Sequence, residues 1–492
     1  MITLNISTQK KHSISPYLYM QFMEPLGVAD ASVDAAWDFV ENEWFPEVMD
    51  KIHELGPTMV RFGGCFASYY HWREAVGKRC ERVPMINHAW SGIYHNQVGT
   101  HEFLDFCKQV KAAPLIVANM ESEGLDFWQR PKNDTLRMGT AEEAAAWVDY
   151  CNNPENALRI ANGAAEPFGV KYWQIGNETS YRTVGFRNTE RHYGFTAEGC
   201  YETTQRFAAA MREKDPSIYL IGWGDNKGAH DKANWCKIMS EADGIDAIAF
   251  HHHFNSGLEN SPLTGTEYRD NYECTWIHLM HAYKSLDDHI KLMRANCGSK
   301  RLAMTEGHFA LPGRNRNEVL SSWGAGVAYA RCLNTIMRHS DVLDIATMAD
   351  FFGNVWQVNA VMLPTPIRAG KPYLQPVGAV MSLFGKHQGT HALDLTYKGA
   401  VDAVASMTDD TVFLHLANID MKRAQELVLE LGGRRIESAE MHYIATDPAT
   451  EITPVNTDIF TVKRVVVEGD RITLPPAAVA AVRIQLAPEN HI

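Results

Sequence analysis

Two glutamates follow apolar segments that resemble buried strands. Glu178 ends the run WQIGNE, where Asn177 precedes it, and Glu306 ends the run LAMTE. Two carboxylates in one cavity can perform glycoside hydrolysis, in which a protonated carboxyl donates to the leaving oxygen and an ionised one attacks the sugar or activates water. Repulsion between them raises the pKa of one and so supplies the acid. For a single strand-end glutamate, a structural ion pair with arginine is the alternative; the presence of both favours catalysis.

The surrounding sequence alternates short strand-like segments with longer segments of helical periodicity, which is typical of βα units around a parallel sheet. The predicted strands are residues 17–22, 58–62, 115–118, 171–176, 218–222, 246–251, 301–305 and 343–348. The predicted helices are residues 45–55, 102–110, 142–151, 196–214, 235–242, 272–295, 321–339 and 377–384. Eight such units close a (β/α)8 TIM barrel, whose active residues lie at the carboxyl ends of strands. A doubly wound sheet also alternates, but no GxGxxG motif follows the first strand.

The sequence changes character after about residue 388, where short alternating runs such as TVFLHLANI and AQELVLELGG are separated by turn residues. This pattern predicts antiparallel strands. The opening run ITLNIS alternates in the same way. The sequence therefore predicts an α/β protein with a (β/α)8 catalytic barrel over residues 13–387 and a β-sandwich domain built from residues 1–12 and 388–492.

The composition limits which classes of partner the protein can bind and in which cellular compartment we expect it. The 46 Lys and Arg against 59 Asp and Glu give a net charge of −13, which disfavours nucleic acid and anionic membrane surfaces. No segment reaches the ~18 apolar residues of a membrane helix, and the first residues lack the order of a signal peptide. The nine cysteines include no CxxC pair, so no disulfide framework or zinc knuckle is indicated. We expect a cytoplasmic protein.

Longer motifs carry a resemblance to a known family. They are QFMEPLG from Gln21, VRFGGCFASYYHWRE from Val60, HAWSGIYHNQVGTHEFLDFC from His88, EPFGVKYWQIGNE from Glu166 and FHHHF from Phe250. With carboxylates after the fourth and seventh strands, the barrel up to about residue 350 resembles glycoside hydrolase family 51, the α-L-arabinofuranosidases. The strand-rich tail matches the carboxyl-terminal sandwich of that family only in kind.

The resemblance implies roles for matching positions. Glu178 corresponds to the general acid/base and Glu306 to the nucleophile of a retaining double displacement, and Asn177 would hold the 2-hydroxyl of the sugar. Glu24 and Cys65 correspond to positions that line the sugar subsite, although a buried structural thiol is an equal alternative for Cys65. The resemblance further implies that Arg61 supports the carboxylates and that Trp90 stacks on the sugar.

Several positions near the expected subsite depart from the family pattern. Cys65 stands in place of the usual Asn, and His253 in place of a Tyr after the sixth strand. Gly307 and His308 replace Trp-Asn after the nucleophile, and Asp350 replaces a Gln at the eighth strand. Because a pocket built to bind one hydroxyl rejects sugars that lack it, these changes bear on which sugar is bound rather than on the reaction type.

The three consecutive histidines allow two interpretations. Side chains alternate along a strand, so His251 and His253 share a face and His252 points away from it. Together with Glu306 or Asp350 they could bind a metal, as in zinc hydrolases. The pair lies on the sixth strand rather than the first, where barrel amidohydrolases have theirs. We therefore favour hydrogen bonds from His251 and His253 to Glu306 and the substrate, and expect no metal and no cofactor.

The sequence and this resemblance thus predict an exo-acting α-L-arabinofuranosidase that acts on a glycoside or oligosaccharide, and the resemblance implies that the substrate derives from plants. The alternatives are a β-galactofuranosidase, a β-xylosidase or an endo-glucanase on the same machinery, or a catalytically silent carbohydrate-binding protein. The resemblance also implies a homo-oligomer, commonly a hexamer, without nucleic-acid or membrane partners.

Overall fold

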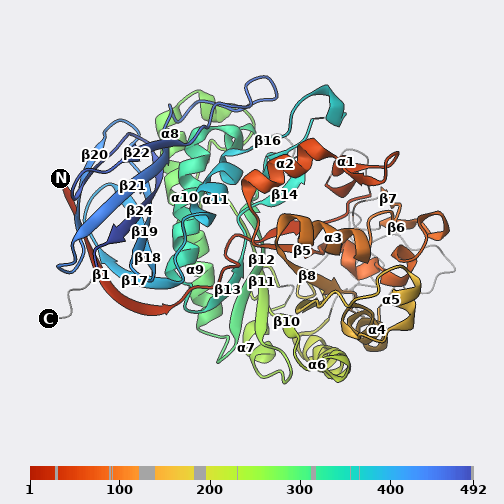
Figure 1. The fold of residues 1–492 in the computed structure, drawn as a ribbon. Coiled ribbons are helices and arrows are strands. Elements are labelled where there is room, and N and C mark those ends of the chain that lie inside the picture. The colour runs from red at the N-terminus through yellow and green to blue at the C-terminus, as the bar shows by residue number, and fades with distance from the viewer. Residues whose placement is uncertain are drawn as a thin grey trace.

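The computed structural model describes residues 1–27, 32–87, 90, 92–120, 139–181, 195–229, 231–311, 317–354, 356–364 and 366–488. Two large sheets dominate these residues, one of eleven strands and one of nine. Helices surround the first sheet, and the second lies at the other end of the molecule (Figure 1). The fold is therefore an α/β barrel joined to a β-rich carboxyl-terminal unit.

Parallel strands of the eleven-stranded sheet form the barrel. They are β2 (Gln21–Met23), β5 (Met59–Phe62), β8 (Ala113–Ala118), β9 (Tyr172–Ile175), β10 (Tyr219–Trp223), β11 (Ala247–Phe254) and β12 (Arg301–Phe309). Two short strands share the eighth place. Of these, β13 (Leu343–Ala346) pairs with β12, and β14 (Asp350–Gly353) pairs with β2. This split strand closes the barrel, and β15 (Asn359–Met362) and β16 (Tyr373–Leu374) extend the sheet beyond it.

Helices cover the outside of the barrel, which is why its strands are buried on both faces. The main ones are α2 (Pro46–Leu55), α3 (Thr100–Val110), α4 (Ala141–Asn152), α6 (Ala197–Lys214), α7 (Trp235–Ser240), α8 (Tyr272–His281), α9 (Tyr283–Arg294), α10 (Trp323–Arg338) and α11 (Pro376–Gly385). Shorter elements are α1 (Val33–Ala36), α5 (Ala157–Ala161) and the small sheets β3 (Trp37–Asp38) with β4 (Glu43–Trp44) and β6 (Met85–Asn87) with β7 (Gly92–Tyr94). In the described part of the chain, no helix is long and apolar enough to span a membrane.

The single helix predicted for residues 272–295 is wrong, because the structure has two. One ends at His281 and the next begins at Tyr283. Both helices pack against α10; in addition, Trp276 of α8 donates its indole N–H to the carbonyl of Ile419, and α9 packs against β11. Ala282, which lies between them, keeps helical dihedrals (φ −55°, ψ −34°), so the interruption is confined to one residue.

The nine-stranded sheet has the order β22-β21-β24-β19-β18-β17-β1-β20-β23. Its strands are β1 (Ile2–Ser13), β17 (His391–Thr396), β18 (Val401–Thr408), β19 (Thr411–Asn418), β20 (Gln425–Glu430), β21 (Ile436–Ile444), β22 (Lys463–Val466), β23 (Arg471–Leu474) and β24 (Val479–Leu486). Strands from both ends of this order contribute to one apolar core, for example Ile472 from β23 and Met441 from β21. The sheet therefore folds over itself as a β-sandwich. The opening strand β1 pairs antiparallel with β17 and parallel with β20.

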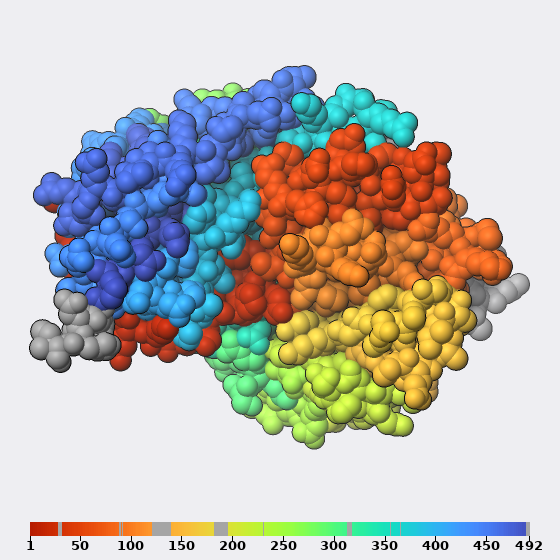
Figure 2. All heavy atoms as spheres, viewed as in Figure 1, coloured from red at the N-terminus to blue at the C-terminus, as the bar shows by residue number. Residues whose placement is uncertain are grey.

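The sandwich packs directly against the barrel helices. Figure 2 shows the carboxyl-terminal residues, in blue, in continuous contact with the rest of the surface. At this interface Asp402 of β18 is buried, and its carboxylate accepts hydrogen bonds from Asn334 Nδ2 at 2.9 Å and Arg338 Nη2 at 2.6 Å. Arg331 Nε adds a third at 3.3 Å. All three donors lie on α10, so one carboxylate ties the two units together.

Replacement of Asp402 by Ala is expected to lower the free energy of unfolding by about 2–4 kcal/mol, because it leaves partly buried guanidinium groups without their anion. Urea titration followed by circular dichroism measures this change. Asp394→Ala is the matched control, since Asp394 pairs with Lys11 where both side chains are more than half exposed. There we expect about 0–1 kcal/mol. Equal effects of the two substitutions would contradict this account of the interface.

Candidate active site

The end of β9 presents Asn177 and Glu178 through an unusual backbone turn. Gly176 has φ +73° and Glu178 has φ +53°, which is the left-handed region that a residue with a side chain seldom adopts. Such conformations persist where the surrounding structure enforces them, often at functional positions. The turn directs the Glu178 carboxylate toward the next strands, where His251 Nδ1 lies 2.9 Å from its Oε1.

Glu306 lies within β12, and a β-bulge sets its direction. Phe250 of β11 pairs with Met304, but the next residue, His251, pairs with Glu306, so Thr305 is an extra residue in β12. The register then continues with His253 opposite His308. As the alternation predicts, His252 lies on the other face. Its ring contacts α9, where Nδ1 is 3.0 Å from His289 Nδ1 and Nε2 is 3.1 Å from Ser285 Oγ.

A completely buried guanidinium group organises the cluster from below. Arg61 of β5 donates from Nη1 to Glu306 Oε1 at 2.9 Å, from Nη2 to Asn177 Oδ1 at 2.6 Å and from Nε to Gln174 Oε1 at 3.1 Å. A planar guanidinium with fixed donor directions suits this task. Arg61 therefore fixes Glu306 and Asn177 relative to each other, as well as supplying positive charge.

Histidines lie between the two carboxylates. His251 Nδ1 is 3.6 Å from Glu306 Oε2 as well as 2.9 Å from Glu178 Oε1, and His253 Nε2 is 3.6 Å from Glu306 Oε2. One donor atom from each of these four side chains lies within 4.8 Å of the others. Cys65 is part of the same cluster, because its Sγ donates to Glu178 Oε2 at 3.4 Å.

These contacts set the charge of Glu306. Burial alone would raise the pKa of its carboxyl, but the nearby His251 ring, the His253 ring at 3.6 Å and the Arg61 guanidinium outweigh burial and hold that pKa well below its usual range. For His253 the two effects act in the opposite directions. Burial lowers the pKa of the imidazole, but the interaction with Glu306 raises it by more, so the pKa of His253 lies above its ordinary value. Glu306 is therefore ionised, and the Arg61 guanidinium compensates its charge.

Glu24 lies beside this cluster and is protonated at neutral pH. Its Oε1 accepts hydrogen bonds from Trp90 Nε1 at 2.8 Å and from the backbone N–H of Phe66 at 3.0 Å. Burial and the nearby charge of Glu306 raise the pKa of Glu24 to about 8. Gly64 permits this close packing, because it adopts φ +137° and a Cβ there would lie 2.3 Å from the Glu24 carboxyl carbon.

A raised pKa has a defined effect on stability. Between pH 4.5, the ordinary pKa, and about 8, folded Glu24 keeps a proton that the unfolded chain has lost, so the free energy of unfolding decreases as pH rises. Glutamine carries no such proton and can keep both hydrogen bonds. We expect Glu24→Gln to gain roughly 3–5 kcal/mol relative to the unmodified chain across this interval. Urea titrations at both ends of the interval measure the difference, and a constant difference would contradict the assigned protonation.

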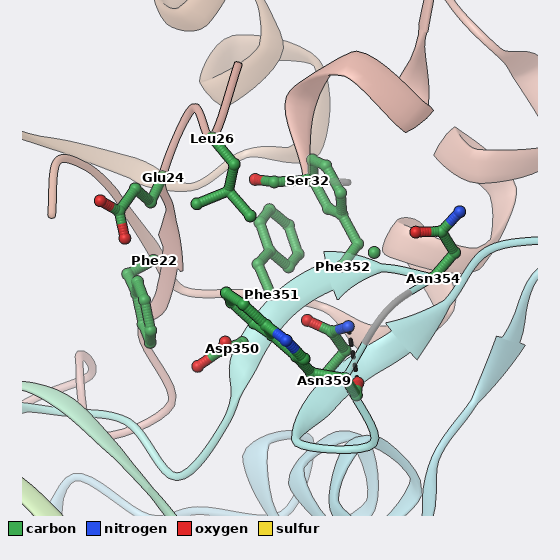
Figure 3. A pocket seen from close by; sticks show the side chains of 11 residues that line it. Phe22, Glu24, Leu26, Ser32, Asp350, Phe351, Phe352, Asn354 and Asn359 are labelled. Atoms are coloured by element: carbon green, nitrogen blue, oxygen red, sulfur yellow. Dashed lines mark hydrogen bonds between the residues drawn. The ribbon is translucent and has the colours of Figure 1, made fainter. Parts of the chain in front are cut away.

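A small cavity of about 30 Å³ extends from Glu24 along the eighth strand. Figure 3 shows Glu24 and Asp350 on one side of it and Asn354 on the other. Its remaining lining is largely aromatic, with Phe22, Phe351, Phe352 and Trp356 among the residues. Asp350 also approaches His308, whose Nε2 is 3.5 Å from Asp350 Oδ1, and the His308 ring lies 4.5 Å from that of His253. Trp90 contacts Trp356 at a centroid distance of 5.3 Å.

The structure thus brings the residues singled out in the sequence into one connected cluster at the carboxyl ends of the barrel strands. These are Glu24, Arg61, Cys65, Trp90, Asn177, Glu178, His251, His253, Glu306, His308 and Asp350. Their roles toward a sugar remain predictions.

Sequence reasoning missed a supporting group. Asp225, just after β10, is fully buried and accepts hydrogen bonds from Tyr181 Oη at 2.7 Å, His289 Nε2 at 2.9 Å and the backbone N–H of His251 at 3.2 Å. It therefore anchors the strand that carries His251 and the turn that follows Glu178. The position of Asp225 at a strand end is the sequence feature that could have found it.

The chain is similar to known α-L-arabinofuranosidases along most of its length. The α-L-arabinofuranosidase 1 domain matches residues 51–274, and the α-L-arabinofuranosidase C-terminal domain matches residues 310–477, so the two together cover most of the chain. A protein of Bacteroides ovatus named intracellular exo-α-L-arabinofuranosidase is 26% identical over 473 residues, which are 88% of this chain and 84% of that protein. α-L-Arabinofuranosidase C of Emericella nidulans is 33% identical over 42% of this chain, which spans only 38% of that relative.

Solved structures agree on the fold. The α-L-arabinofuranosidase of Thermotoga maritima, solved with arabinose, superposes with a TM-score of 0.77 at 20% identity, over 99% of this chain and 100% of that one. The family 51 enzyme of Xanthomonas axonopodis pv. citri also gives 0.77 at 20% identity, over 98% and 99% of the chains. The chain belongs to the α-L-arabinofuranosidase family, glycoside hydrolase family 51, and is a glycoside hydrolase.

Proposed function

We propose that this chain is a retaining, exo-acting α-L-arabinofuranosidase in which Glu306 is the nucleophile and Glu178 the general acid/base. The observation that carries the proposal is the proximity of the two carboxylates, which have oxygens within 4.8 Å of each other. Retaining enzymes place their carboxyl groups about 5–5.5 Å apart, whereas inverting enzymes leave about 6.5–9.5 Å for a water molecule.

In the first step, ionised Glu306 attacks the anomeric carbon and forms a glycosyl ester as Glu178 donates its proton to the leaving oxygen. In the second, Glu178 takes a proton from water, which attacks the anomeric carbon and releases Glu306. The low pKa of Glu306 supports the nucleophile role, because that carboxyl must be ionised before attack. His251 Nδ1 lies close to both carboxylates. In each step its ring can therefore interact with whichever of the two carboxylates carries the negative charge.

The other side chains are proposed to hold the sugar. Asn177, fixed by Arg61, would contact the 2-hydroxyl, where a hydrogen bond strengthens as the transition state develops. Neutral Glu24 offers a hydroxyl donor that an ionised carboxylate lacks. Cys65, His253, His308 and Asp350 would determine which remaining hydroxyls are accepted, and the Trp90 ring would cover the sugar face.

Purified protein should be tested on nitrophenyl α-L-arabinofuranoside, β-D-galactofuranoside and β-D-xyloside, with Glu306→Gln alongside. The proposal predicts turnover of the arabinofuranoside that resists a chelator and depends on Glu306. Preference for another glycoside would overturn the sugar assignment and keep the mechanism. The absence of turnover on the panel and on arabinose-containing oligosaccharides would overturn the proposed function and favour a binding protein.

We also propose a cytoplasmic location and a homo-oligomeric state, with a hexamer as the expected form. The Bacteroides ovatus relative is named intracellular, which supports the location. Cell fractionation tests the first point, and light scattering after size-exclusion chromatography tests the second. A monomer would contradict the expected assembly.

A further inference from the structure

The two carboxylates and the two histidines that lie between them are all side chains of types that bind metal ions. Glu178, His251, His253 and Glu306 present one oxygen or nitrogen atom each within 4.8 Å of the others. A tetrahedral zinc ion with bonds of about 2.0–2.1 Å separates its ligand atoms by about 3.3–3.4 Å. The separations along the cluster, 2.9 Å from His251 to Glu178 and 3.6 Å from Glu306 Oε2 to each histidine, bracket that value.

The surroundings orient these atoms as a metal site requires. Histidine ligands generally hold their second ring nitrogen in a hydrogen bond. His251 has this arrangement, because its Nε2 is 3.0 Å from Thr305 Oγ1 while Nδ1 faces the carboxylates. Glu306 Oε1 accepts a hydrogen bond from Arg61, and Glu306 Oε2 faces the two histidines. The Thr305 bulge makes Glu306 and His251 direct neighbours across the strands.

Charge also favours a cation. Two carboxylates face the histidines, and Asp350 lies nearby, whereas the Arg61 guanidinium contacts Glu306 from below. Zinc would take the place of protons that the histidines share with the carboxylates.

We infer that Glu178, His251, His253 and Glu306 bind one divalent transition-metal ion, such as Zn²⁺, and that the occupied protein does not hydrolyse glycosides. The proposed double displacement itself needs no metal. The inhibitory part rests on the proposed function, because coordination would remove the lone pair with which Glu306 attacks and the oxygen with which Glu178 moves a proton. The metal would thus be a reversible inhibitor.

Calorimetric titration of chelator-treated full-length protein with ZnCl₂ tests the site without reference to activity. We expect one tight site per chain, weakened at least about 10-fold by His253→Tyr and by Glu178→Gln. The matched control is His53→Tyr, because His53 is exposed on α2 away from the cluster. This control should bind within about 2-fold of the unmodified chain, since no ligand is lost.

Glycoside hydrolysis measured at the same zinc concentrations provides the second readout. Activity should fall with the same midpoint as binding, recover on addition of chelator, and require at least about 10-fold more zinc in His253→Tyr. Absence of saturable binding, or equal affinity in both cluster variants and the control, would overturn the inference and leave the proposed function intact. Zinc binding that depends on His253 in a protein without hydrolase activity would support the site and overturn the proposed function.

Discussion

Replacement of Glu306 by Gln is expected to reduce kcat on an arabinofuranoside by at least about 10⁴-fold, since an amide cannot form the glycosyl ester. The introduced glutamine retains an oxygen that can accept from Arg61 Nη1, so the buried guanidinium keeps a partner and the fold should persist. Initial rates with nitrophenyl α-L-arabinofuranoside and thermal melting measure the two effects.

The matched control for this substitution is Glu54→Gln, because Glu54 pairs with Lys51 on α2 and its side chain is 53% exposed. We expect this variant to keep the activity of the unmodified chain, because exposed ion pairs contribute about 0–1 kcal/mol. A Glu306→Gln protein that folds and retains more than a small fraction of the activity would remove Glu306 from the nucleophile role.

Replacement of Glu178 by Gln is expected to have an effect that depends on the leaving group. Without the acid, kcat/KM should fall by about 10²–10⁴-fold for an alkyl or sugar leaving group. A dinitrophenyl leaving group needs no protonation, so its departure should be much less affected, and hydrolysis of the ester then becomes slow. Added azide should restore turnover, because an anionic nucleophile does not require a general base.

The test of Glu178 is the pattern across leaving groups rather than the size of any single loss. Rates for a series of aryl arabinofuranosides, with and without azide, give that pattern. With azide the product should be a glycosyl azide, and its anomeric configuration should be the same as that of the sugar released when water attacks the glycosyl ester. Equal losses for all leaving groups, together with no response to azide, would show that Glu178 positions the substrate or maintains the structure of the site and is not the general acid/base.

Much of the fold could be predicted because it depends on local periodicity. The runs that became β5, β9 and β12 are apolar because both faces of a barrel strand are buried, and this composition is visible in the sequence. Glu178 and Glu306 could then be singled out by their positions relative to strands. The domain boundaries at residues 12–13 and 387–388 remain predictions.

The detailed geometry of the site could not be predicted, because it depends on non-local register. Nothing in the run TEGHF shows that Thr305 is an extra residue opposite β11, yet this bulge places Glu306 beside His251. The left-handed conformation of Glu178 is likewise imposed by packing rather than by residue type. The interruption at Ala282 between α8 and α9 is likewise not visible in a sequence whose helical pattern is continuous.

The proposed mechanism depends on a covalent glycosyl ester on Glu306, which mass spectrometry can detect. The Glu178→Gln variant, mixed with dinitrophenyl α-L-arabinofuranoside, should accumulate this ester because its hydrolysis lacks a general base. Acid quenching and proteolysis should then yield a peptide that contains Glu306 and carries one pentosyl unit. The absence of an adduct while dinitrophenol is still released, or a pentosyl unit on a peptide without Glu306, would contradict the double displacement proposed for this chain.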